Sequence, residues 1–223
     1  MTSEITHENL CAVNELVLSA CAKFASSNQS HAQLPPIFIL TPDRFTLSAE
    51  KILLKTTPAL LNVRVVTFSM LFNILNQEEN KILDKTSSVL FLWKSIHLLK
   101  DQLQYFAKSV HQYSFAEKMF NTINQLQSSM ADFKTLEKNA KTEITKRKMH
   151  DISIIYAKYR ELTREYIDGS GALDWLIKHI PNNPIIKSAH IYVTGFEHLS
   201  IQRAEVVRLL KSNAKSFVIG VQL

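Results

Sequence analysis

Glycine is scarce in this sequence of 223 residues, which contains four: Gly169, Gly171, Gly195 and Gly220. None of them is followed by lysine, so the G-x-x-x-x-G-K-[ST] loop that cradles nucleotide phosphates is absent. The G-x-G-x-x-G pattern of dinucleotide-binding proteins is absent as well. Such loops need glycines because their backbone N–H groups must approach the anion closely. The sequence therefore excludes the usual phosphate-binding loops.

Cysteine is rarer still. Cys11 and Cys21 both lie in the first predicted helix, and two cysteines are too few for a disulfide framework or a cysteine-built zinc site. We predict that both are small apolar packing residues. The eight histidines form no H-E-x-x-H pair, and no G-x-S-x-G nucleophile motif occurs. We therefore expect no metal site and no catalysis by this chain alone.

Long apolar runs are also missing. No window approaches the roughly 20 unbroken apolar residues of a membrane-spanning helix. The first residues, Met1–Glu8, include two glutamates and no basic residue, which argues against a signal peptide. We expect a cytoplasmic protein without a membrane partner.

The residues that are present suffice for a large core, because 46% of them are apolar. The length suits one α/β domain, or a core with an inserted subdomain. Part of the net charge of +6 comes from one short basic segment. Its members are Lys134, Lys138, Lys141, Lys146, Arg147 and Lys148. Such a segment is compatible with binding to phosphate backbones and equally with a solvated helix face.

Strands and helices alternate in the first part of the chain. A helix is predicted over Asn9–Phe24, and its broad apolar stripe consists of Leu10, Val13, Leu16, Val17, Ala20 and Phe24. The unbroken apolar run Ile37–Leu40 predicts a strand that is covered on both faces of a parallel sheet. A second strand is predicted over Val63–Thr67. The helix after it carries its apolar residues on one face: Phe68, Leu71, Phe72 and Leu75.

The middle of the chain, from about Glu79 to His179, shows no convincing strand pattern and has helical periodicity instead. Three apolar stripes stand out. They are Leu92, Ile96, Leu99, Leu103 and Phe106; Phe115, Met119, Ile123, Leu126 and Met130; and Ile152, Ile155, Tyr159, Leu162 and Tyr166. Three helices with stripes of this spacing are expected to pack as a small bundle.

The strand pattern returns at His190–Thr194, where β-branched and aromatic residues favour an extended backbone. Gly195 permits a tight turn, and Ser200 can cap a helix over Ile201–Leu210. Ser216–Val221 then has the composition of another buried strand.

The order of these elements predicts an α/β fold with a parallel sheet and an inserted helical subdomain. Residues 1–78 and 185–223 are assigned to the α/β core, and residues 79–184 to the helical insertion between the second and third strands. Because the sequence ends directly after its last predicted strand, we expect it to be part of a larger subunit.

Four segments carry a resemblance to a known family. Residues 39–50 (ILTPDRFTLSAE) match P-(D/E/N)-x-x-(T/S)-F-x-x-E, with Leu47 in place of the phenylalanine. Residues 65–71 (VVTFSML) match V-x-(S/T)-F-S-x-L, and residues 148–156 (KMHDISIIY) match K-L-x-D-(L/I)-x-x-(I/L)-Y with methionine for leucine. Residues 189–202 match the corner h-I-Y-(V/I)-D-G-F-x-x-(F/L)-(T/S), with Thr194 for aspartate. In this order the segments resemble the AddB/RexB subunits of bacterial ATP-dependent helicase–nucleases.

The resemblance implies the N-terminal, helicase-like domain of such a subunit, with a RecA-like (P-loop NTPase-like) fold, within a complex that resects DNA double-strand breaks. Active helicases hold magnesium with an acidic pair at the corner after the third strand, where this chain has Thr194 and Gly195. The resemblance therefore implies a degenerate ATP site and no catalytic residue in this segment. In the family, ATP, magnesium and an iron–sulfur cluster belong to other domains or subunits.

The resemblance also implies two partners, single-stranded DNA and an AddA/RexA-type helicase–nuclease subunit. In some relatives this domain scans the unwound strand for a short regulatory (Chi-type) sequence through the loops after its first strands. The matching positions are Thr41, Asp43, Arg44, Phe45, Thr46, Phe68, Ser69, Met70, Phe196 and His198. The arginine could bind phosphate, and the three phenylalanines either stack on bases or belong to the core.

Two hypotheses of different kinds remain open. In the first, the chain is a non-catalytic module that binds single-stranded DNA, and its binding is sensitive to salt. In the second, it is a structural scaffold whose helical insertion holds the partner subunit through an exposed apolar patch. An active ATPase is disfavoured because the phosphate loop is missing.

Overall fold

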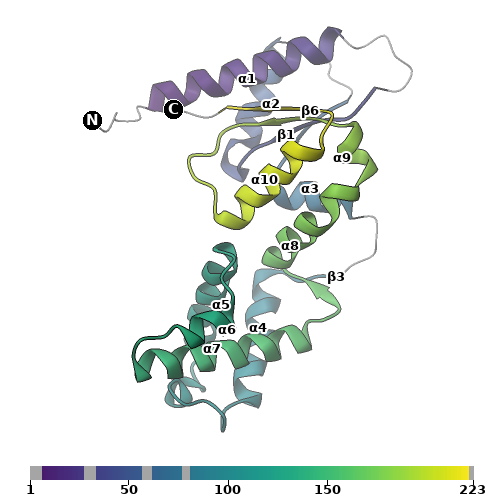
Figure 1. The fold of residues 1–223 in the computed structure, drawn as a ribbon. Helices are drawn as coiled ribbons and strands as arrows, with labels where there is room; N and C mark the ends of the chain where they lie inside the picture. The colour runs from purple at the N-terminus through teal and green to yellow at the C-terminus, as the bar shows by residue number, and fades with distance from the viewer. Residues whose placement is uncertain (1–6, 28–33, 57–61, 77–80, 221–223) are drawn as a thin grey trace. The chain divides into compact units, whose positions relative to one another are not determined.

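The computed structural model describes residues 7–27, 34–56, 62–76 and 81–220 (Figure 1). The chain divides into two compact units. The first unit contains residues 1–77, 175–199 and 204–223, and the second contains residues 78–174 and 200–203. The assignment of an α/β core to residues 1–78 and 185–223, with an insertion over 79–184, stays a prediction.

A four-stranded parallel sheet forms the centre of the first unit, in the order β2-β1-β5-β6. Its strands are β1 (Ile37–Leu40), β2 (Val63–Val66), β5 (His190–Val193) and β6 (Ser216–Ile219). All four residues of β1 and of β5 are buried, as expected for central strands of a parallel sheet. The predicted α/β class with a parallel sheet is confirmed.

Helices cover both faces of this sheet. The helices and 3-10 turns in this part of the chain are α1 (His7–Ser27), η1 (Asp43–Phe45), α2 (Thr46–Thr56), α3 (Phe68–Leu75), η3 (Ile180–Asn182), α9 (Pro184–Ser188) and α10 (Ile201–Asn213). Side chains of α1 and α2 form one core with Ile37, Ile39 and Val65 of the sheet. Because side chains alternate along a strand, Phe38 and Leu40 face the opposite layer.

The buried face of α1 agrees only in part with the predicted one: Val17 is buried and Phe24 packs against the core, as predicted. Leu16 is 73% exposed and Ala20 is exposed, whereas Asn14, Leu18 and Cys21 are buried. The predicted stripe did not include Asn14, a polar residue that lies on the buried face. The side chains of residues 7–13, including Cys11, lie outside the described part of the structure.

The prediction for Cys21 is confirmed, since its side chain is fully buried. Burial raises the pKa of the Cys21 thiol to about 12, so the thiol stays protonated at neutral pH. The prediction that β6 is a buried strand is wrong, because Val218 and Ile219 are 38% and 40% exposed at the edge of the sheet.

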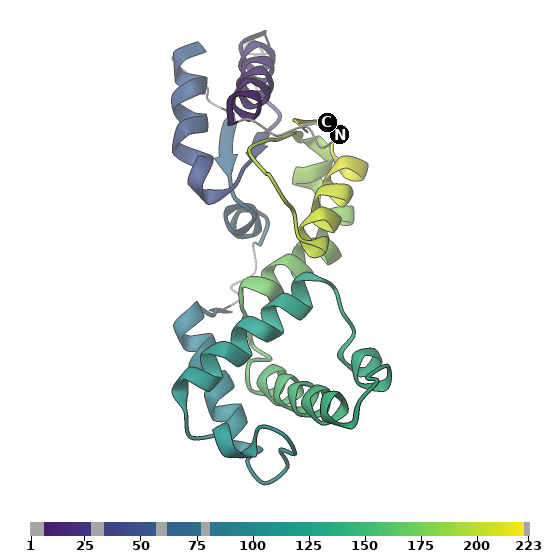
Figure 2. The same ribbon diagram turned by 90° about the vertical axis from the view of Figure 1, so that its left-hand side faces the viewer.

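The second unit is mainly helical (Figure 2). Its helices are α4 (Lys85–Leu98), η2 (Ala107–Ser109), α5 (Tyr113–Ser128), α6 (Phe133–Lys138), α7 (Glu143–Leu162) and the first part of α8 (Gly169–His179). Helix α4 packs against α5 and α7, and α6 packs against α7. The buried residues of α4, α5 and α7 form one apolar cluster, so most residues of the three predicted stripes do meet in one core. Two stripe residues were placed wrongly: Met130 follows the end of α5 and is 50% exposed, and Tyr166 lies beyond the end of α7.

Two details of this region were predicted wrongly. The strands β3 (Lys81–Ile82) and β4 (Tyr166–Ile167) form a short parallel pair. Strands of two residues are too short to produce a recognisable periodicity in the sequence. Leu103 and Phe106 were assigned to the first helix of the bundle, but α4 ends at Leu98. Leu103 is nevertheless buried in the helical core, and Phe106 packs against it.

A buried carboxylate explains how the chain after α4 returns to this core. Asp151 of α7 is fully buried and accepts backbone N–H bonds from Gln104, Tyr105 and Phe106 at 2.9, 2.8 and 2.9 Å. A carboxylate bonded to three donors offsets much of the cost of its own burial. Asp151 therefore fastens the loop to α7 and has a structural role.

We predict that Asp151→Ala lowers the free energy of unfolding by about 2–4 kcal/mol, because three backbone N–H groups lose the carboxylate that accepts their hydrogen bonds. Asp151→Asn keeps the shape and one acceptor oxygen, so its effect is expected to be smaller. Urea denaturation followed by circular dichroism measures both. Equal stability of the Ala variant and the wild type would contradict a structural role for this carboxylate.

Candidate nucleic-acid interface

Three loops meet at one edge of the sheet. Leu40, Val66 and Val193 end β1, β2 and β5 and are partners in the strand register. The backbone N–H of Thr41 donates to Val66 O at 3.0 Å, and that of Thr194 donates to Leu40 O at 3.1 Å. The carboxyl edge of a parallel sheet is the usual position of a ligand crevice. The fold thus brings together the loops to which the sequence analysis assigned DNA binding.

A threonine follows each of these strands, and all three threonines are buried. The Thr67 hydroxyl accepts a hydrogen bond from the N–H of Met70 at 3.3 Å and caps α3. The Thr194 hydroxyl donates to Asn14 Oδ1 at 2.6 Å. Thr41 Oγ1 has no hydrogen-bond partner among the described residues. These three hydroxyls therefore lie beneath the accessible surface at the carboxyl edge of the sheet.

The predicted DNA-binding residues differ in exposure. Five are exposed: Asp43, Arg44, Ser69, Met70 and His198. Three are half-buried: Phe45, Thr46 and Phe196. Thr41 and Phe68 are buried. A bound strand would therefore meet the first group directly and only parts of the second.

One ion pair connects the loop after β1 with the loop after β5. Arg44 Nη2 donates to Glu197 Oε1 at 2.8 Å, and the two side chains are 65% and 50% exposed. An exposed pair of this kind contributes little to stability because water competes for both charges. Its main effect is to hold the guanidinium of Arg44 at the surface of the edge.

The aromatic side chains lie mostly beneath this surface. Phe68 is 7% exposed, and its ring centroid lies 5.6 Å from that of Phe196. Phe68 therefore lies in the core, as in the alternative interpretation of the three phenylalanines. Phe45 and Phe196 keep part of their rings accessible.

Gly195 shapes the corner between β5 and the following loop. Its φ of +83° is one that residues with a Cβ rarely adopt. A Cβ at this position would lie 2.8 Å from Cδ1 of Phe45 and 3.1 Å from Oγ1 of Thr41. Glycine is therefore required here both by the backbone and by the close approach of the loop after β1.

Asn14 is a residue of this corner that the sequence analysis missed. Its Oδ1 accepts both the Thr194 hydroxyl at 2.6 Å and the Gly195 N–H at 2.9 Å. The signal was available, because Asn14 lies three and four residues before the buried Val17 and Leu18 and so falls on the apolar face of its helix. A polar residue at such a position has a partner in the interior.

The residues at this corner do not fit a magnesium–nucleotide site. Magnesium prefers carboxylate oxygens, and neither Thr194 nor Gly195 supplies one. The Thr194 hydroxyl is already bonded to Asn14. Within the described ranges no group of three or more His, Cys, Asp or Glu residues is arranged to hold a metal ion.

The basic segment of the second unit lies on α6 and the first turns of α7. Arg147 pairs with Glu143 at 3.5 Å, and Nζ of Lys148 lies 4.6 Å from the ring centroid of Tyr105. Lys138 is exposed. Both interpretations of this segment, as a phosphate contact and as a solvated helix face, stay predictions.

The fold and the corner together define a class: an α/β protein with a parallel sheet and a largely helical second unit, whose Thr194–Gly195 corner offers no carboxylate. The sequence matches the family described as "ADDB, N-terminal" over residues 19–223, and the chain belongs to this family. The resemblance to AddB/RexB subunits is thereby confirmed.

Individual relatives are named as the B subunit of an ATP-dependent helicase/deoxyribonuclease. That of Bacillus pumilus is 30% identical over 203 residues, which cover 81% of this chain. Those of Staphylococcus aureus (strain MRSA252) and Clostridium novyi are 26% and 23% identical over 197 and 188 residues, covering 82% and 80% of the chain.

The chain spans 17% of the length of each of these three relatives.

None of the helices in the described ranges has the length and apolar character that a bilayer crossing requires.

We predict that Gly195→Ala destabilises the protein by at least about 2 kcal/mol, because the positive φ and the contact with Phe45 both oppose a Cβ. Gly169→Ala is the matched control, since a Cβ there meets nothing within 4 Å, and its effect should stay within about 0.5 kcal/mol. Thermal unfolding of both variants measures the difference, and similar melting temperatures would refute the strained corner.

Proposed function

We propose that this chain is a non-catalytic, RecA-like module of a helicase–nuclease and binds single-stranded DNA along the carboxyl edge of its sheet. Family membership supports the helicase–nuclease context, because the relatives are named as the B subunit of an ATP-dependent helicase/deoxyribonuclease. The parallel sheet supports a RecA-like core. The role assigned to the complex is the repair of DNA double-strand breaks.

The observation that carries the proposal is the position of Arg44. Its guanidinium lies at the surface where two loops of the edge meet, 2.8 Å from the Glu197 carboxylate. A phosphate oxygen can replace that carboxylate with the same hydrogen-bond geometry. Ser69 in the first turn of α3 and His198 in the loop after β5 are exposed nearby and can donate further hydrogen bonds.

Bases of the strand would contact the accessible parts of Phe45 and Phe196. Stacking on aromatic rings tolerates any base, so it provides affinity with little sequence preference. Preference for a Chi-type sequence would have to come from contacts between the bases and polar side chains of the same loops. Met70 would add an apolar contact beside these side chains.

ATP, magnesium and the iron–sulfur cluster are assigned in this proposal to other domains or to the partner subunit. The mismatch between the Thr194–Gly195 corner and a magnesium site supports that division. The proposed protein partner is an AddA/RexA-type helicase–nuclease subunit, and the proposed compartment is the cytoplasm.

A second candidate function is a scaffold that holds the partner subunit. Large apolar side chains exposed on the second unit favour it: Leu90, Leu98 and Ile144 are 48%, 54% and 60% exposed. A shallow pocket of about 420 Å³ beside Leu98 and Ile154 is lined by the same helices, α4 and α7. If the oligonucleotide titration described next detects no DNA binding, the scaffold becomes the favoured function.

We predict that a labelled single-stranded oligonucleotide binds the chain with an affinity that falls as salt rises. Arg44→Gln should weaken binding about fivefold at low salt and reduce the slope of log affinity against log salt by about 0.7, the value for one lost phosphate contact. Fluorescence anisotropy at several salt concentrations measures both quantities.

Arg208→Gln is the control for that experiment. Arg208 is also an exposed arginine paired with a glutamate, Glu205, but it lies on α10 outside the three loops. Equal losses in the two variants would show that binding follows net charge and not the edge. Replacing Phe68 is unsuitable as a test, because removal of a buried ring destabilises the fold.

We further predict that Glu197→Gln raises the affinity about twofold to fivefold, because Arg44 no longer has to leave a carboxylate to reach a phosphate. Glu205→Gln removes the same charge from the pair with Arg208 and should leave the affinity nearly unchanged. The same titration measures both variants, and a lower affinity of Glu197→Gln would show that the ion pair assists binding instead of competing with it.

A further inference from the structure

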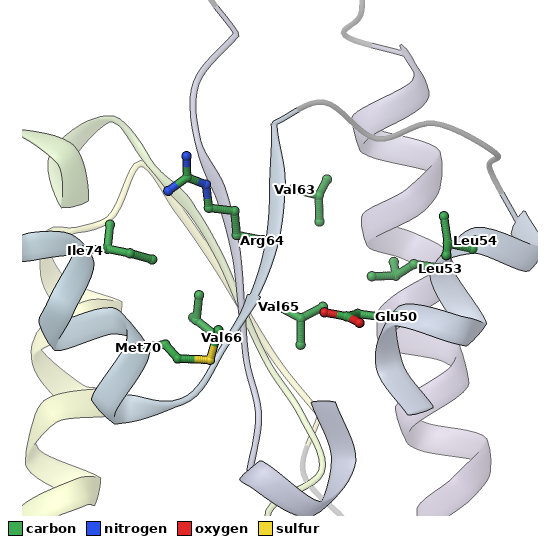
Figure 3. A pocket seen from close by; sticks show the side chains of 9 residues that line it. All are labelled: Glu50, Leu53, Leu54, Val63, Arg64, Val65, Val66, Met70 and Ile74. Carbon is green, nitrogen blue, oxygen red and sulfur yellow. The ribbon is translucent and has the colours of Figure 1, made fainter. Parts of the chain in front are cut away.

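A groove of about 480 Å³ runs along the outer edge of β2, between α2 and α3 (Figure 3). It lies to the side of the sheet and not at the carboxyl edge. Nine residues line it: Glu50, Leu53, Leu54, Val63, Arg64, Val65, Val66, Met70 and Ile74. Neither the family membership nor the proposed DNA site gives this groove a role.

The backbone of β2 offers unused hydrogen-bonding groups to the groove. β2 is an edge strand whose register pairs it with β1 alone. The N–H groups of Ile37 and Thr41 in the β1 region donate to the carbonyls of Asn62 and Val66. Backbone groups alternate in direction along a parallel strand, so those of Val63 and Val65 point away from β1. No residue in the described ranges bonds to them.

The side chains divide the groove into two compartments on opposite faces of the strand. Figure 3 shows Val63 and Val65 directed toward α2, where Glu50 also lies. Arg64 and Val66 are directed toward α3, with Met70 and Ile74. A strand added beside β2 would place its own side chains alternately into these two compartments, because successive side chains point to opposite faces.

Both compartments are apolar, and each carries one charge of a different sign. Leu54 and Met70 at the rims are 59% and 46% exposed, more than most large apolar side chains of this unit. Neither Glu50 nor Arg64 forms an ion pair with a described residue. Edge strands are normally protected by charges, prolines or covering elements, and an apolar edge with open backbone groups is suited to strand addition.

We propose that the β2 groove binds an extended segment of a partner protein as an additional strand of the sheet. The segment that fits has mostly β-branched residues, an acidic side chain facing Arg64 and a basic side chain facing Glu50. These two charges must lie on opposite faces of the added strand, hence an odd number of positions apart. The proposal does not rest on the proposed binding of DNA, although Met70 belongs both to the groove and to the predicted DNA-binding residues.

Two fluorescein-labelled peptides of equal composition test this pattern. Val-Asp-Val-Val-Lys-Val places its charges on opposite faces, whereas Val-Asp-Val-Lys-Val-Val places both on the same face whichever way the strand runs. Anisotropy with the 223-residue chain should give about fivefold tighter binding of the first peptide. Arg64→Glu should abolish the preference, and Lys51→Glu, an exposed charge reversal on α2 outside the groove, should leave it intact.

Backbone methylation tests strand addition itself. Versions of the first peptide methylated on one set of alternate amides should lose binding at least tenfold, and versions methylated on the other set should keep it, because only one set faces β2. Equal affinity of the two peptides, equal behaviour of the two methylated sets, or no binding of either peptide would overturn the proposal. Concentration-dependent dimerisation that Arg64→Glu removes would overturn it as well, since a second copy would then occupy the groove.

Discussion

The in-register parallel pairing of β1 with β2 and β5 is the constraint on which the remaining structure depends. It brings the ends of three strands, separated by up to about 150 residues of sequence, to one level of the sheet. The segments that form the candidate DNA site all begin at these three strand ends. The pairing is stabilised because β1 and β5 are buried on both faces, and a shift by one residue would turn their side chains toward the wrong layers.

The corner after β5 is held in place by hydrogen bonds from one asparagine and by the conformation of one glycine. Asn14 bonds to both the Thr194 hydroxyl and the Gly195 N–H, and the positive φ of Gly195 makes room for Phe45. The threonine hydroxyl and the asparagine oxygen match as donor and acceptor, which the sequence of the corner alone does not reveal.

Elements that depend on local pattern were predictable, and those that depend on tertiary contacts were not. The apolar runs of β1 and β5 and the face of α3 follow from hydrophobic periodicity, and the structure has them where expected. The loop fastened by Asp151 and the short pair β3–β4 follow from distant partners. In the candidate site, the sequence located the three loops, but exposure could not be read from it: Phe68 turned inward and Arg44 toward Glu197.

In the two proposals β2 serves two partners, because its carboxyl end and its outer side present different chemical groups. At its carboxyl end β2 leads into Thr67 and the first turn of α3, where Ser69 belongs to the proposed DNA site. Along its outer side it presents the backbone groups of Val63 and Val65. Salt weakens contacts of the first kind, since they depend on phosphate charge, and it leaves backbone pairing in the groove nearly unchanged. Salt also screens the exposed charges of Glu50 and Arg64, but these are only two contacts of the added strand. The affinity for DNA is therefore expected to fall more steeply with rising salt than the affinity for the added strand.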